Sequence, residues 1–154
     1  KTTQGIQEEA FEAQIILAKE LKLPIVIHAR DSFDEIFAIV DKHNDENLTG
    51  IFHCFNGTIE QANKIINYGG FKLGIGGVVT FKNAGVDKVV KQIPLEHLVL
   101  ETDSPYLAPH PNRGKRNEST YLTLIAQKVA DLHEVSLEEI ANVTTSNSKE
   151  VFGI

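Results

Sequence analysis

The chain has 154 residues, of which 42% are hydrophobic and 23% are charged, as expected of a globular domain with a core of its own. Its formal net charge of -6 argues against broad electrostatic binding to nucleic acid, although a bound metal ion with a few local cations would still accept a phosphate group. No apolar run reaches the roughly 18 residues that a membrane-spanning helix needs, and the single cysteine, Cys54, excludes an internal disulfide and is typical of the reducing cytoplasm.

Short apolar runs alternate with amphipathic segments along the chain, and the two kinds of segment predict strands and helices of one α/β domain over residues 1–154. The predicted strands are apolar throughout, which is typical of parallel strands buried on both faces. Ser32 with Glu35, and Thr58 with Gln61, have the spacing of capping boxes. In chain order, we expect a helix over residues 6–22, a strand over 24–28, a helix from 32 to about 42, a strand over 50–55, a helix from 58 to about 69, a strand over 71–75, a short helix over 86–92, a strand over 97–103, a loop over 104–118, and two or three closing helices, one of them opened by Ser136 with Glu139.

Three of the four predicted strands end in side chains that bind metals: His28, His53 and Asp103. Because the carboxyl ends of parallel strands meet at one edge, we expect these side chains to converge on one pocket. Imidazole and carboxylate groups are natural ligands of a zinc-like divalent ion. A single histidine at a strand end is more often structural, but the equivalent positions of all three favour a metal site.

The alternation of side chains along a strand makes the prediction more specific. If Asp103 points into the site, Glu101 points there as well. If His53 points into the site, Cys54 faces the helices and Phe55 faces the site. We therefore expect Cys54 to be a packed core residue rather than a metal ligand.

A basic cluster follows the last predicted strand. Arg113, Lys115 and Arg116 lie within four residues of each other in a chain that is acidic as a whole. Guanidinium and ammonium groups are suited to phosphate recognition, and Gly114 would allow a ligand to approach the backbone closely. The alternative is a solvated surface loop, but its place directly after Asp103 favours a functional role.

Five stretches carry the pattern of a known family: Ile27–Arg30, Phe52–Phe55, Glu101–Tyr106, Arg113–Lys115 with Asn117 and Glu118, and Thr144–Asn147. Over essentially its whole length the chain resembles the TatD-type deoxyribonucleases of the amidohydrolase-like superfamily. The resemblance implies a (β/α)8 TIM barrel that holds one or two divalent ions (zinc, magnesium or manganese) at its carboxyl-terminal face. It also implies hydrolysis of phosphodiester bonds in DNA.

The resemblance further implies roles for individual residues. Asp103 would be a metal ligand that also orients or deprotonates the attacking water, which makes it the catalytic residue. Glu101 would support it from inside the barrel. The remaining implied site residues are the metal ligands His28 and His53 and the phosphate contacts Arg30, Arg113 and Lys115.

Two motifs of the family are absent from this sequence: a first strand that ends in a His-x-His pair, and a glutamate at the end of the fourth strand. The chain also has no methionine. We therefore expect the second half of a barrel, strands five to eight, with the N-terminal strands missing. Such a half barrel should bind metal weakly, have impaired activity, and associate with itself or with an N-terminal half through its open sheet edges. The alternatives are an amidohydrolase-type esterase or amidase and an inactive folding or interaction fragment.

Overall fold

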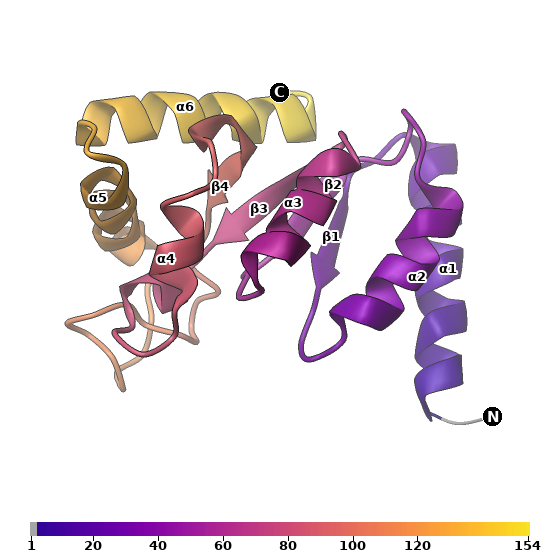
Figure 1. The fold of residues 1–154 in the computed structure, drawn as a ribbon, viewed down its shortest axis with the longest axis horizontal. Coiled ribbons are helices and arrows are strands. Elements are labelled where there is room, and N and C mark those ends of the chain that lie inside the picture. Colours follow the sequence, from indigo (N-terminus) through magenta and orange to yellow (C-terminus); the bar gives the residue numbers. More distant parts are fainter. Residues whose placement is uncertain (1–2) are drawn as a thin grey trace.

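The structure, a computed structural model, describes residues 3–154 as a parallel four-stranded sheet packed against helices (Figure 1). The strands lie side by side in chain order: β1 (Ile25–His28), β2 (Gly50–His53), β3 (Phe71–Ile75) and β4 (Leu98–Leu100). No helix in this described part is long and apolar enough to cross a membrane. The α-helices are α1 (Thr3–Leu21), α2 (Phe33–His43), α3 (Ile59–Asn67), α4 (Val86–Val90), α5 (Leu122–His133) and α6 (Leu137–Phe152), and the 3-10 helices are η1 (Gly77–Thr80), η2 (Leu95–His97) and η3 (Ser119–Tyr121).

The predicted order of strands and helices is confirmed, and so is the parallel α/β fold. Two strands end earlier than predicted. β2 ends at His53 because Cys54 has a left-handed backbone with φ 47°, and β4 ends at Leu100, shortly before Asp103 turns the chain with φ 56°. Both changes of direction lie at the edge where the polar residues gather.

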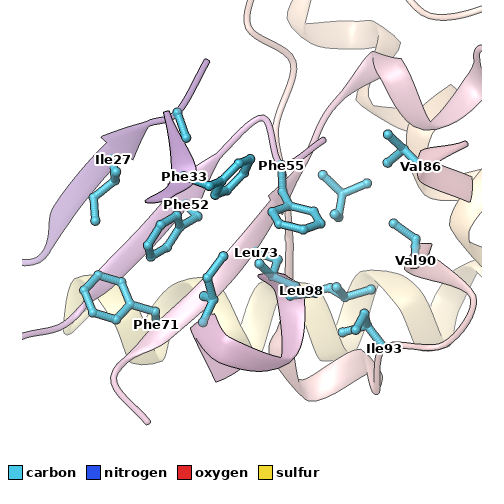
Figure 2. Close-up of a cluster of buried hydrophobic side chains, with 14 of the residues drawn as sticks. Ile27, Phe33, Phe52, Phe55, Phe71, Leu73, Val86, Val90, Ile93 and Leu98 are labelled. Atoms are coloured by element: carbon cyan, nitrogen blue, oxygen red, sulfur yellow. The ribbon is translucent and has the colours of Figure 1, made fainter. Parts of the chain in front are cut away.

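The core lies between the sheet and the helices. Ile27, Phe52, Leu73 and Leu98 are direct neighbours across the four strands and form one buried row. Figure 2 shows this row together with the aromatic rings that pack beside it. Phe71 meets Phe52 edge to face, with ring centroids 5.3 Å apart. The opposite face of the sheet therefore carries the residues one step along each strand, among them the candidate site residues.

The first helix is confirmed, but its apolar face is not the one that packs. Ile6, Leu17 and Leu21 are all more than half exposed, and Ile15 is the buried residue of α1. α1 contacts α2 through the opposite side, where His43 hydrogen-bonds Glu12 at 2.7 Å. An apolar face of α1 is thus exposed.

The two predicted capping boxes differ in outcome. The Thr58 hydroxyl accepts the Gln61 N–H at 3.3 Å, and the Gln61 side chain accepts the Thr58 N–H at 2.9 Å, so this box is confirmed. The box at Ser32 is wrong, because Ser32 has φ -141° and ψ 26° and its side chain makes no capping hydrogen bond. A capping hydroxyl needs an extended backbone to reach the free N–H groups of the first turn.

This difference predicts unequal effects of two matched substitutions. Thr58→Ala should lower the free energy of unfolding by about 1 kcal/mol, because it leaves helix donors without a partner. Ser32→Ala should change it by less than about 0.5 kcal/mol, as for ordinary surface substitutions. Urea unfolding followed by circular dichroism measures both. Equal losses for the two variants would contradict the assignment of the caps.

Candidate metal centre

The site is centred on the imidazole of His53, at the end of β2. Its Nδ1 lies 2.8 Å from Glu101 Oε1, and its Nε2 lies 3.2 Å from Asp103 Oδ1. All three side chains are partly buried, and His53 and Glu101 are each about one-fifth exposed. The prediction that Glu101 and Asp103 point to the same side as His53 is confirmed.

Gly74 allows this contact across the intervening strand. β3 separates β2 from β4, and a Cβ atom built on Gly74 would lie only 2.5 Å from Glu101 Oε2. Glu101 therefore reaches His53 through space that any other residue at position 74 would occupy. Sequence reasoning missed this role, because the glutamate that fills the space beside Gly74 follows another strand of the sheet.

Glu101 determines the tautomer of His53. Its Oε1 atom accepts the Cys54 N–H at 2.7 Å and faces His53 Nδ1 at 2.8 Å, so Nδ1 must carry a proton. The Nε2 lone pair of a neutral ring would then face the Asp103 carboxylate, which is repulsive. Either a second proton or a cation between Nε2 and Asp103 removes this repulsion.

The spacing of these atoms fits a shared metal ion. Two ligand atoms that each lie about 2.0–2.1 Å from a tetrahedral zinc are about 3.3 Å apart, and His53 Nε2 and Asp103 Oδ1 are 3.2 Å apart. A carboxylate that binds the other nitrogen of a ligating histidine is the usual support of such a site, because it fixes the ring and raises its basicity. His53 and Asp103 therefore fit as a pair of ligands, with Glu101 behind them.

His28 lies next to this pair without completing it. It is the register partner of His53 on β1, and the two ring centroids are 5.9 Å apart. His28 is exposed. Within residues 3–154, no group of three or more histidine, cysteine, aspartate and glutamate side chains is arranged to hold a metal ion. The three-ligand set of His28, His53 and Asp103 therefore stays a prediction.

The prediction for the sides that Cys54 and Phe55 face is wrong. Phe55 is only 3% exposed and packs in the core against Phe33, with ring centroids 5.7 Å apart. The left-handed Cys54 interrupts the alternation, so the chain does not continue as an ideal strand. Burial, followed by the negative charges of Glu101 and Asp103, raises the pKa of the Cys54 thiol to about 11. Cys54 is partly exposed rather than part of the buried core, and the expectation that it is not a metal ligand stays a prediction.

The loop after β4 is held against η1. The Thr80 hydroxyl accepts the His110 N–H at 2.8 Å, and a Cβ atom on Gly77 would lie 2.1 Å from the Leu107 carbonyl oxygen. The Arg113 guanidinium stacks over the Phe81 ring at 4.2 Å. The basic cluster is therefore part of an ordered loop in which the position of Arg113 is defined by its contact with Phe81.

The predicted phosphate contacts are exposed. Arg30 follows the end of β1, and Arg113 and Lys115 project from the loop after β4. The structure brings Glu101, His53 and Asp103 into direct contact and places His28 beside them. It gives no direct polar contact between these residues and Arg30, Arg113 or Lys115 among the interactions of the described chain.

Comparison with known proteins decides the family. The model of the TatD-related DNase family matches residues 1–153. The chain belongs to the TatD family. An uncharacterized metal-dependent hydrolase of Bacillus subtilis, YabD, is 48% identical over 100% of this chain and 60% of its own length. The 3'-5' ssDNA/RNA exonuclease TatD of Citrobacter rodentium is 35% identical over 99% of this chain and 60% of its own length.

A solved TatD homologue shares the fold. The crystal structure of YJJV from Escherichia coli superposes with a TM-score of 0.85 at 27% sequence identity, over 92% of this chain and 54% of that one. The present TatD chain thus spans 60% or less of the length of each of these relatives. The family resemblance expected from the sequence is confirmed, and it extends over nearly all residues of the chain.

Proposed function

We propose that this TatD chain contributes one side of a divalent-metal site that hydrolyses phosphodiester bonds in DNA. The observation that carries the proposal is the His53 ring, which is held by Glu101 through one nitrogen and faces Asp103 with the other. The names of the relatives, a metal-dependent hydrolase and an ssDNA/RNA exonuclease, support the same reaction class.

His53 and Asp103 would hold the ion, with His28 as a third ligand from the neighbouring strand. A divalent ion (zinc, magnesium or manganese, one or two per site) supplies a lowered pKa for a coordinated water and charge stabilisation at phosphorus. Asp103 orients the attacking water and accepts its proton, and Glu101 keeps the His53 ring in the required tautomer. This division of work leaves Asp103 as the catalytic residue.

Substrate binding would rest on cations outside the metal pair. The guanidinium carbon of Arg113 lies over the Phe81 ring at 4.2 Å from its centroid, and this contact limits the rotation of the side chain. Lys115 and Arg30 are exposed at the same end of the sheet and supply further positive charge. Together they would bind the phosphates of a DNA strand, which the net-acidic remainder of the chain repels.

We further propose that β1 to β4 are the second half, strands five to eight, of a (β/α)8 barrel in one domain. The relatives' greater length, the unpaired edges of β1 and β4, and the open apolar face of α1 support this. In that arrangement the edges pair with an N-terminal half or with a second copy of the chain.

The free Cys54 thiol fits a cytoplasmic location.

A substrate panel tests the proposed reaction and its rivals. The chain, loaded with zinc or manganese, is incubated with bis(p-nitrophenyl) phosphate, a single-stranded oligonucleotide and p-nitrophenyl acetate. We expect slow, metal-dependent cleavage of the two phosphodiesters only, reduced about tenfold or more by Arg113→Ala, which removes a charge-assisted contact. Cleavage of the acetate alone would favour the esterase, and no cleavage at all would favour the inactive fragment.

A further inference from the structure

Asn117 is a polar side chain buried beside the site, with 2% of its surface exposed. Its amide nitrogen donates to the Thr102 carbonyl oxygen at 2.6 Å and to the Tyr106 carbonyl oxygen at 2.5 Å. Its amide oxygen accepts the Glu118 N–H at 2.9 Å, and its backbone N–H donates to the Pro105 carbonyl oxygen at 3.0 Å. Both donors of the side chain are therefore used, and both bind backbone close to Asp103.

These contacts enclose the turn that carries Asp103. Thr102 precedes Asp103, and the Tyr106 N–H donates back to the Asp103 carbonyl oxygen at 2.8 Å. Asp103 itself has a left-handed backbone with φ 56°. Aspartate tolerates this conformation better than most residues, but such a backbone persists only where its surroundings define it. Within the turn, the Thr102 hydroxyl accepts hydrogen bonds from the Ser104 N–H at 3.4 Å and the Ser104 hydroxyl at 3.1 Å. The Asn117 amide links the two ends of the turn.

We propose that Asn117 is a positioning residue that holds the turn from Thr102 to Tyr106 so that the Asp103 carboxylate stays opposite His53. Only a side chain with two donors on one atom bridges two carbonyl oxygens in this way. An aspartate at position 117 keeps the shape but sets a carboxylate against both carbonyls. The consequence for metal binding rests on the function proposed above, whereas the hold on the turn does not.

The chain offers a matched control in Asn147 on α6. Its side chain is also buried, with 6% exposed, and its amide nitrogen also bridges two carbonyl oxygens, those of Leu95 at 2.8 Å and Leu98 at 2.7 Å. These carbonyls lie in η2 and at the first residue of β4, whereas Asp103 follows the end of β4. Asn147→Asp therefore creates the same chemical conflict away from the site.

The first arm of the test needs no metal. Amide hydrogen exchange is measured by NMR on the wild-type chain and on Asn117→Asp, Asn117→Ser and Asn147→Asp. We expect the Tyr106 N–H and the N–H of residue 117 to exchange at least tenfold faster in Asn117→Asp, with Asn117→Ser, which keeps one donor, in between. Asn147→Asp should leave both amides as in the wild type. Unchanged exchange in the Asn117 variants would overturn the proposal. If Asn117→Asp does not fold, the exchange rates of Asn117→Ser test the proposal instead.

The second arm measures zinc affinity by calorimetric titration of the same variants. Supporting residues of metal sites typically contribute about tenfold to a hundredfold in affinity, and we expect a loss of that size in Asn117→Asp. Asn147→Asp should bind zinc within about twofold of the wild type, even if its melting temperature falls as much as that of Asn117→Asp. Loss of stability alone does not move Asp103. Equal affinity in Asn117→Asp and the wild type would overturn the role in metal binding. If the wild type binds no zinc, the proposed metal function fails, and the exchange arm alone decides on Asn117.

Discussion

Asp103→Asn is expected to weaken zinc binding by the chain roughly a hundredfold. This is the upper end of the loss in affinity when a residue behind the ligands is replaced, and Asp103 is itself a proposed ligand. The substitution replaces the charged oxygen that faces His53 Nε2 at 3.2 Å with a neutral amide oxygen. Asparagine is as compatible as aspartate with the left-handed φ of 56°, so the fold should be retained. Calorimetric titration of both chains gives the two dissociation constants.

The control for this prediction is Asp131→Asn on α5. Asp131 is exposed and accepts a hydrogen bond from Gln127 at 2.8 Å on the surface of the helix. It has the same charge as Asp103 but no part in the site, so zinc affinity should not change. A similar loss in both variants would show that net charge, rather than the Asp103 carboxylate, governs the affinity.

Gly50→Ala is expected to cause the largest loss of stability among the substitutions considered. A Cβ atom on Gly50 would lie 1.9 Å from the carbonyl oxygen of Ile25, which is its register partner on β1. The colliding atom belongs to the backbone and cannot rotate away, so β1 and β2 must separate. We expect the free energy of unfolding to fall by about 3 kcal/mol or more, at the upper end of the range for overpacked sites.

Gly69→Ala separates this collision from the effect of glycine itself. Gly69 has φ 83°, and no atom lies within 4 Å of a Cβ atom built on it. Its replacement should therefore cost about 1 kcal/mol, for the backbone conformation alone. Urea unfolding of both variants provides the comparison. A loss in Gly50→Ala no greater than in Gly69→Ala would contradict the close contact between β1 and β2.

The periodic features of the sequence were sufficient to predict the sheet. Continuous apolar runs are typical of buried parallel strands, and the polar residue at each strand end has no other place than the carboxyl edge of the sheet. That reasoning brought His53, Glu101 and Asp103 together correctly, because all three lie at or just beyond the carboxyl ends of parallel strands of one sheet. It also placed His28 next to His53, as the register of β1 and β2 has it.

The same reasoning failed where one backbone angle or one neighbour distant in sequence determines the direction or the contacts of a side chain. The left-handed Cys54 sent Phe55 into the core, and no local pattern marks a cysteine for that conformation. Gly74 matters because of a glutamate from another strand, and Asn117 because of carbonyls 11 and 15 residues away. Ser32 has the right spacing for a cap but lacks the backbone angles. Such contacts exist only in the folded chain, so spacing along the sequence does not reveal them.

The most direct test of the metal site is anomalous X-ray diffraction from crystals of the chain soaked in zinc. We expect a peak between His53 Nε2 and Asp103 Oδ1, about 2.0–2.2 Å from each atom. We also expect Glu101 to stay on Nδ1 of the same ring and the peak to be lost in Asp103→Asn. A zinc-soaked crystal with His53 still in direct contact with Asp103 and no peak between them would contradict the account.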